Sequence, residues 1–273
     1  MAGIGVRLNK IFGRNTLTTN MIGFFYSTLV TVAPMFAIII NLVLMEYFLK
    51  FSTLGYAQRE LFSCTILYTF IFSLLTASPF NAVLSRYISD VIYEERYQDI
   101  LPCYHIGMML NIVLSCLVGI PFCLWEHFVG GVSVAYVFAG FWCYISLVFV
   151  FYSMIYLSIC KDYQRIAQYY IVGMLVAFFL SLFLRYICHW GITQSMLAAM
   201  DAGFFLTAVL ENALVKRYFR KNSNRYKPVL SYFKMYWQLV VTNFLYILGL
   251  YVHNFVFWTT DMRMVVVDSF VCN

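Results

Sequence analysis

Long apolar runs with few charged residues alternate with short polar segments along this chain. A helix rises about 1.5 Å per residue, so a run of about 20 residues can cross a hydrocarbon core of about 30 Å. Seven runs approach or exceed that length: Met21–Met45, Leu61–Leu84, Tyr104–Leu124, Val132–Ile159, Tyr169–Ile187, Thr193–Val215 and Leu230–Val252. The pattern predicts about seven transmembrane helices, followed by a tail, Asn254–Asn273, that is too short to cross again.

The run Leu61–Leu84 passes directly into a charged segment, Arg86–Asp99. Pro79 near the end of the run lacks an amide N–H and clashes with the preceding turn, so this helix should kink there. The backbone groups that the kink frees must be satisfied by protein or by a water-filled cavity. We therefore expect this helix to face other helices, and we expect further bends at Pro34 and Pro121.

The composition is that of an integral membrane protein. Hydrophobic residues make up 63% of the chain and charged residues only 11%, whereas soluble domains average about 25% charged residues. No Gly/Ser-rich linker or soluble domain interrupts the runs. We predict an all-α integral membrane fold. The eight cysteines are scattered without a C-x-x-C pair, which favours small buried apolar residues over a disulfide framework or a metal site.

Lys and Arg predict the orientation, because they accumulate in short cytoplasmic loops. With the N-terminus inside, fourteen of them fall on the inner side and four on the outer side. The chain then divides into four parts: a cytoplasmic amphipathic segment (1–19), a six-helix membrane lobe (20–215), a basic cytoplasmic loop (216–229), and a seventh helix with an unfinished extracytoplasmic tail (230–273).

The sequence contains no recognisable catalytic pattern. H-E-x-x-H, G-x-S-x-G and Walker A sequences do not occur, and the four histidines lie singly near the ends of runs. We expect no enzymatic activity, no metal and no cofactor. Nucleic acid is not an expected partner either, because the basic residues lie at a membrane surface without a nucleic-acid-binding fold.

Asp201 is the candidate for a mechanistic role. It lies eight residues beyond Thr193 in the sixth run, which is about 12 Å of helix rise. A carboxylate at that depth costs about 2.5 kcal/mol or more unless it is protonated, paired or facing water. Asp201 could relay a proton or another cation, or it could form a structural ion pair with Arg185 at the outer end of the fifth run.

Uncharged polar residues within or at the ends of the runs allow two interpretations. They could line a hydrated path for a sugar polymer, or they could form interhelical hydrogen bonds, which is the interpretation we favour. These residues are Asn41, Asn111, Asn212 and Asn243. Ala199 and Gly203 form a small-xxx-small pair that would let the sixth helix approach a neighbour closely.

A basic loop follows the sixth run. Its twelve residues from Lys216 to Lys227 hold no acid and six cations, Lys216, Arg217, Arg220, Lys221, Arg225 and Lys227. Each can contribute about 1 kcal/mol of attraction to an anionic leaflet. The loop would fix the topology, and it could also dock the lipid bilayer or a cytoplasmic partner with an acidic face.

Several short segments along the whole chain carry a family resemblance: Met1–Gly5, Phe72–Thr76, Pro79 with Phe80, Arg86–Asp90, Ile92 with Tyr93, Ile100–Pro102, His253, Phe257 with Trp258, and Asp268–Phe270. Together they resemble PelG, the polytopic membrane component of Pel-type exopolysaccharide machinery. The resemblance implies assembly and export of an amino-sugar-rich exopolysaccharide across a bacterial cytoplasmic membrane during biofilm formation. It also implies a cytosolic glycosyltransferase and other synthase subunits as partners.

The family resembles the exporter superfamily of multidrug and oligosaccharidyl-lipid transporters, which is built of two six-helix lobes. Against that architecture, the chain would be an N-terminal fragment holding one lobe and the first helix of a second. Two other functions stay open on the sequence. One is an ion-coupled exporter of small molecules or lipid-linked sugars, and the other is a non-transporting scaffold for a polysaccharide synthase.

Overall fold

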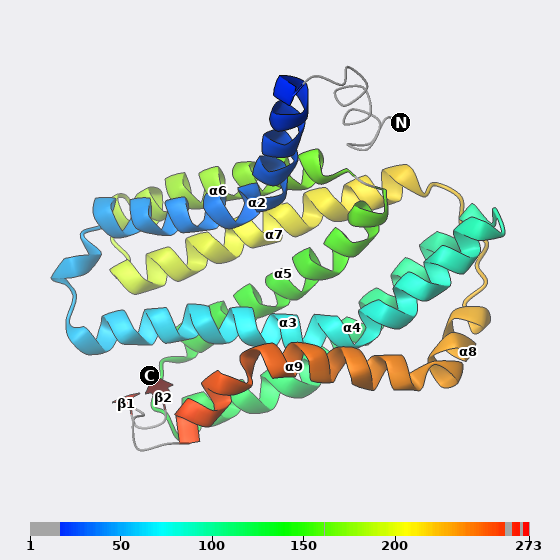
Figure 1. Ribbon diagram of the computed structural model, residues 1–273. Helices are drawn as coiled ribbons and strands as arrows, with labels where there is room; N and C mark the ends of the chain where they lie inside the picture. The colour runs from blue at the N-terminus through cyan, green and yellow to red at the C-terminus, as the bar shows by residue number, and fades with distance from the viewer. Residues whose placement is uncertain (1–16, 161, 260–263, 268–269, 273) are drawn as a thin grey trace.

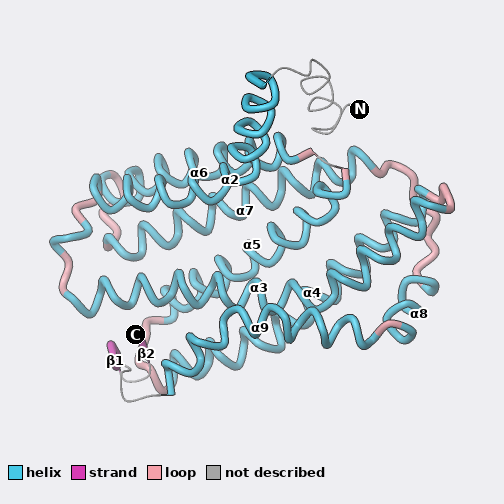
Figure 2. The backbone as a smooth tube through the Cα atoms, viewed as in Figure 1, coloured by secondary structure: helices cyan, strands magenta, loops and turns pink. Residues whose placement is uncertain are grey.

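The computed structural model describes residues 17–160, 162–259, 264–267 and 270–272, and this part of the chain is almost entirely helical (Figures 1 and 2). Its elements are α2 (Leu17–Phe48), η1 (Phe51–Thr53), α3 (Tyr56–Tyr93), η2 (Tyr97–Asp99), α4 (Ile100–Phe128), α5 (Val134–Ile159), α6 (Tyr163–Tyr186), α7 (Ile192–Tyr218), α8 (Lys227–Met235), α9 (Trp237–Thr259), β1 (Met264–Val267) and β2 (Phe270–Cys272).

Six helices in the described part of the chain, α3 to α7 and α9, are long and apolar enough to cross a membrane. α2 has 32 residues with Pro34 inside it, and Figure 1 shows that it bends sharply; its apolar part, Val32–Phe48, is shorter than these six. The predicted all-α membrane fold is confirmed. The first sixteen residues, which hold most of the predicted amphipathic segment, lie outside the described residues.

The helices pack in two layers with α5 between them. In one layer α7 packs against α6, and α6 packs against α2; in the other, α3 packs against α4 and α9. Figure 1 shows α5 running between these layers, and its contacts with both α7 and α3 join them. Large side chains, including Tyr104, Tyr152, Tyr156 and Phe204, are fully buried in this core.

Glycines let α6 and α7 approach each other closely. A Cβ added to Gly203 would lie 2.7 Å from the carbonyl oxygen of Gly173 and 2.8 Å from the Cβ of Ala177. Ala199, one turn before Gly203, is fully buried as well. The close approach predicted from the small residues of the sixth run is confirmed at Gly203. This contact also fixes the position of Asp201, two residues earlier on α7.

The buried middle of α3 satisfies the backbone around Pro79 within the protein. The carbonyl of Leu75 has lost its helical donor, because proline has no N–H, and it accepts a 3.5 Å hydrogen bond from Ser78 Oγ. The carbonyl of Ser78 accepts a hydrogen bond from Asn243 Nδ2 of α9. The prediction that this helix faces other helices is confirmed, and Figure 1 shows that α3 bends along its length.

The predicted seventh span, Leu230–Val252, is wrong in its bounds. The structure has two helices there, α8 and α9, with Tyr236 between them. On α8, Lys234 is exposed while Val229 is fully buried, so this short helix has a polar and an apolar side. Such a helix suits the membrane surface, whereas the apolar α9 suits the interior. The average hydropathy of the run conceals this change.

The end of α3 also differs from the prediction. The sequence placed a charged segment from Arg86 outside the helix, but α3 continues to Tyr93. A helix does not have to end where the hydrocarbon ends, because its backbone hydrogen bonds are internal and its charged side chains can reach water. The extra turns give α8 a surface on which to pack.

Aromatic and charged side chains attach α8 to the end of α3. Tyr232 Oη donates a 3.1 Å hydrogen bond to Asp90 Oδ2, and its ring meets that of Tyr87 edge to face at 4.9 Å. Arg86 lies 4.9 Å from the ring centre of Tyr236. Burial of the phenol, together with the hydrogen bond to Asp90, raises the pKa of Tyr232. The hydroxyl therefore stays protonated and donates at physiological pH.

We predict that Tyr232→Phe loosens α8 from α3. Losing a hydrogen bond to a charged acceptor at a partly exposed site should destabilise the contact by about 1.4 kcal/mol, or roughly tenfold in the opening equilibrium. Hydrogen exchange of the α8 amides measures this opening. Tyr226→Phe changes an exposed phenol of the same segment and should leave exchange unchanged; equal exchange in the two variants would show that the Asp90 contact contributes nothing.

A small β-hairpin and one disulfide depart from the sequence expectations. β1 and β2 pair antiparallel within the predicted tail and contact α3. Within the described residues, six cysteines are free thiols, namely Cys103, Cys116, Cys123, Cys143, Cys160 and Cys188. Cys64 is disulfide-bonded, so its interpretation as a simple buried thiol is wrong.

Candidate functional site

Asp201 lies on α7 and faces α5. Its side chain is half-buried, and its Oδ1 accepts a 3.0 Å hydrogen bond from Ser146 Oγ. Arg185 does not pair with it, because Arg185 Nη1 donates at 2.8 Å to the carbonyl of Trp190. No ion pair among the described residues joins Asp201 to Arg185. The structural ion pair is therefore wrong, and the relay stays a prediction.

An open pocket of about 650 Å³ lies beside Asp201, between the beginning of α5 and the beginning of α7. Two of its polar groups are the Asp201 carboxyl and the Gln194 amide, and much of its wall is aromatic. The residues around it are Ala135, Tyr136, Phe138, Ala139, Trp142, Trp190, Gln194, Ala198 and Asp201. Asp201 thus borders an open space between α5 and α7 rather than a fully packed core.

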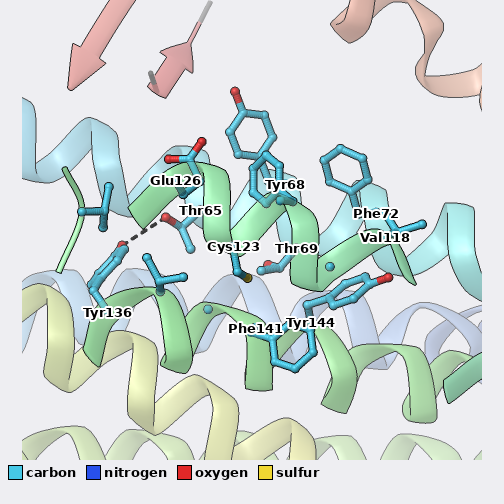
Figure 3. Close-up of a pocket in the computed structure, with 15 residues that line it drawn as sticks. Thr65, Tyr68, Thr69, Phe72, Val118, Cys123, Glu126, Tyr136, Phe141 and Tyr144 are labelled. Carbon is cyan, nitrogen blue, oxygen red and sulfur yellow. Dashed lines mark hydrogen bonds between the residues drawn. The ribbon is translucent and has the colours of Figure 1, made fainter. Parts of the chain in front are cut away.

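A second pocket, of about 250 Å³, lies between α3, α4 and α5 (Figure 3). Thr65 and Tyr136 meet at one end, where Tyr136 Oη donates a 3.2 Å hydrogen bond to Thr65 Oγ1. The walls are mainly aromatic and aliphatic, with Phe72, Phe141 and Tyr144 among them. This pocket therefore suits an apolar group better than a hydrated sugar. Tyr136 borders both pockets.

Three of the four candidate asparagines make contacts within or between helices, whereas Asn212 Oδ1 is buried without a hydrogen-bond partner among the described residues. Asn41 is buried on α2 and its Nδ2 lies 3.5 Å from Met174 Sδ of α6 and 3.4 Å from Met200 Sδ of α7. Asn111 Nδ2 donates at 2.8 Å to the carbonyl of Gly107 in its own helix. With Asn243 bonded to Ser78, these placements support the interhelical and local hydrogen-bonding interpretation over a polar path.

The basic residues of the loop after α7 form an exposed surface. We call it the basic surface; its members are Lys216, Arg217, Arg220, Lys221, Arg225 and Lys227, all exposed. Ser223 N donates a 3.1 Å hydrogen bond to the carbonyl of Gln98, which fastens the loop to the turn between α3 and α4. The cations are thereby held at the ends of several helices and are free to meet an anionic partner.

Glu211, which was not among the candidates predicted from the sequence, has 0% exposure on α7. It lies toward the end of α7 that carries the basic surface, close to a buried group of tyrosines between α4, α5 and α6. The signal was present, because Glu211 is a second acid within the run Thr193–Val215. The depth argument that singled out Asp201 applies to it equally.

A family match covers the whole chain. The family is PelG, described as "Putative exopolysaccharide Exporter (EPS-E)", and the match extends over residues 1–273. Searches of curated proteins and of solved structures gave no match. The matched region includes every helix, both pockets and the basic surface, and it agrees with the resemblance of the scattered segments. The chain belongs to the PelG family, a family of the exopolysaccharide export machinery, and is a multi-pass membrane protein.

Proposed function

We propose that this protein assembles and moves an amino-sugar-rich exopolysaccharide of the Pel type across the bacterial cytoplasmic membrane. The observation that carries the proposal is the family match over the whole chain. The bundle of long apolar helices supports it, as does the pocket in which Asp201 and Gln194 lie among aromatic rings. Aromatic faces and hydrogen-bonding groups are the chemistry that sugar rings need.

The distribution of charge supports an orientation with the N-terminus in the cytoplasm. Ten of the thirteen Lys and Arg in the described residues lie toward the end of the bundle formed by the last turns of α3, α5 and α7. Lys50, Arg59 and Arg185 lie at the opposite end. Because Lys and Arg accumulate on the cytoplasmic side, the basic surface faces the cytoplasm and the Asp201 pocket lies in the outer half.

The basic surface supplies a place for the partners that extend the polymer. Six exposed cations without an acid favour an acidic protein face or anionic lipid headgroups. The cytosolic glycosyltransferase and other synthase subunits would dock there. The growing polymer would then enter a bundle in which residues 20–215 form one lobe, with α9 as the first helix of a second lobe.

We predict that Asp201→Asn lowers export while sparing membrane insertion. Asparagine keeps the shape and the hydrogen bond to Ser146 but cannot carry charge, so a relay or an ionic contact with an amino sugar would lose about 1.5–3 kcal/mol, roughly tenfold or more in rate. Surface polymer per membrane-inserted protein is the measurement. Normal export by this variant would remove Asp201 from the mechanism.

A deletion strain tests the proposed function itself. Cells that lack this protein should lose surface polymer detected by a lectin for N-acetylgalactosamine, and the wild-type gene should restore it. Lectin staining of permeabilised cells controls for synthesis. If surface polymer persists in the deletion strain while the same pathway makes it, the exopolysaccharide assignment is contradicted.

A further inference from the structure

Glu211 is a buried acid to which the proposed function assigns no role. Its side chain has 0% exposure, and neither carboxyl oxygen has a hydrogen-bond partner among the described residues. Burying an ionised carboxylate without a donor or a counter-ion costs several kcal/mol, even after the surroundings relax. The cost of burying the Glu211 charge therefore has to be removed in some way other than a hydrogen bond or an ion pair.

Two tyrosines near Glu211 use their hydroxyls elsewhere. Tyr104 of α4 and Tyr170 of α6 interact with it electrostatically. Tyr104 Oη shares a 3.0 Å hydrogen bond with Ser153 Oγ of α5, and Tyr170 Oη donates to Met154 Sδ at 3.3 Å. In this arrangement neither hydroxyl bonds to the carboxyl.

The tyrosine group continues through hydrogen bonds that, among the described residues, involve no cation. Tyr152 Oη donates at 2.7 Å to the carbonyl of Tyr104 and lies 2.9 Å from Tyr156 Oη. Cys103 Sγ lies 3.6 Å from Tyr156 Oη. Among the described residues, Glu211 forms no ion pair with a lysine, arginine or histidine. The charged groups nearest along α7 are Lys216 and Arg217, which are exposed.

A metal ion does not fit this environment. No group of three or more His, Cys, Asp and Glu side chains in the described part of the chain could hold one. Cations such as Ca²⁺ take six or more oxygen ligands, whereas Glu211 offers one carboxyl. A proton needs no further ligand, and it removes the charge that would otherwise be buried.

We propose that Glu211 is a proton-binding site that couples proton release to separation of α4 and α5 from α6 and α7. In the closed arrangement seen here, the carboxyl holds a proton; when the helices separate, water reaches the group and the proton can leave. The proton is the ligand, and the O–H bond of the carboxyl is the only bond formed or broken. The idea that this proton drives transport rests on the proposed export function, whereas proton binding at Glu211 does not.

The position of Glu211 on α7 suits this coupling. Asp201 lies ten residues earlier on the same helix, about 15 Å away by helix rise. Asp201 borders an open pocket, whereas Glu211 is closed off near the end that carries the basic surface. A shift of α7 would change the access of both carboxyls at once, because a helix moves as a unit.

Infrared spectroscopy of the purified full chain in lipid nanodiscs tests proton binding directly. Difference spectra between neutral and alkaline samples should contain the C=O stretching band of a protonated carboxyl in the wild type. Glu211→Gln should lose that band, while Asp201→Asn and Glu211→Asp should keep a carboxyl band. An unchanged band in Glu211→Gln, or no such band in the wild type, would overturn the proposal.

Export measurements in the same variants test the coupling. Glu211→Gln should lower surface polymer by about fivefold or more, which is the smallest effect usual for two energetically coupled sites. Glu211→Asp should restore part of the export. Wild-type export by Glu211→Gln would overturn the coupling. If cells lacking the chain export normally, the proposed function fails instead, and the infrared band still decides whether Glu211 binds a proton.

Discussion

Gly203→Leu is expected to give the largest loss of stability of any single substitution considered for this protein. A Cβ at this position would lie 2.7 Å from a backbone oxygen and 2.8 Å from the Cβ of Ala177. Neither atom is the free end of a flexible side chain, so α6 and α7 must move apart. Overpacking of this kind costs about 3 kcal/mol or more. Thermal unfolding in detergent, followed by tryptophan fluorescence, should show a clearly lower midpoint.

Gly249→Leu is the matched control, because a Cβ at Gly249 of α9 would meet nothing within 4 Å. It adds the same side chain to another helix and should leave the midpoint near that of the wild type. Equal midpoints for the two variants would contradict the close packing of α6 against α7. Since Asp201 lies two residues from Gly203, the Gly203 variant should also lose export.

Neutralising the basic surface is expected to give the largest functional loss. Replacing its six Lys and Arg by Gln removes about 1 kcal/mol of attraction per residue, or about 6 kcal/mol in all. If only a third of this contributes to docking, the binding constant for the anionic partner still falls by more than about tenfold. Surface polymer should fall by about tenfold or more. Measurement of surface polymer together with a reporter fused after α7 distinguishes lost docking from altered topology.

A charge-preserving variant controls for the exact side chains. Exchanging each Lys for Arg and each Arg for Lys at the same six positions keeps the positive charge of the basic surface, so most export should be kept. If the Gln variant exports as well as this control, the basic surface serves neither docking nor orientation. The predicted role would then be wrong, even though the cations are exposed.

The sequence was sufficient to predict the helices because the lipid interior imposes a simple rule. A span must be apolar over about 20 residues, and the runs that meet this length correspond to α2 to α7 and α9. The ends were less predictable. α3 extends beyond the run Leu61–Leu84 at both ends. The apolar run needs to be only as long as the hydrocarbon layer is thick, whereas the helix can continue outside that layer. α8 was concealed because most of it lies in the same run as the apolar α9, and the average hydropathy of that run hides its polar side.

The candidate site was only partly predictable. Depth within a run identified Asp201 from the sequence, and its pocket depends on how α5 and α7 pack, which no local pattern encodes. The supposed partner Arg185 faces the loop at Trp190 instead. Glu211 is closed off by residues of α4, α5 and α6 that lie far apart in the chain. Its burial is therefore a property of the assembled bundle.

Transport into inverted membrane vesicles tests the central claim most directly. Vesicles with the cytoplasmic face outward, prepared with the synthase subunits, would be supplied with a nucleotide-sugar donor and then treated with a glycosidase that digests the polymer. The export account predicts that polymer is protected until detergent is added, and that vesicles lacking this protein make only digestible polymer. Equal digestion with and without the protein would contradict a role in moving the polymer across the membrane.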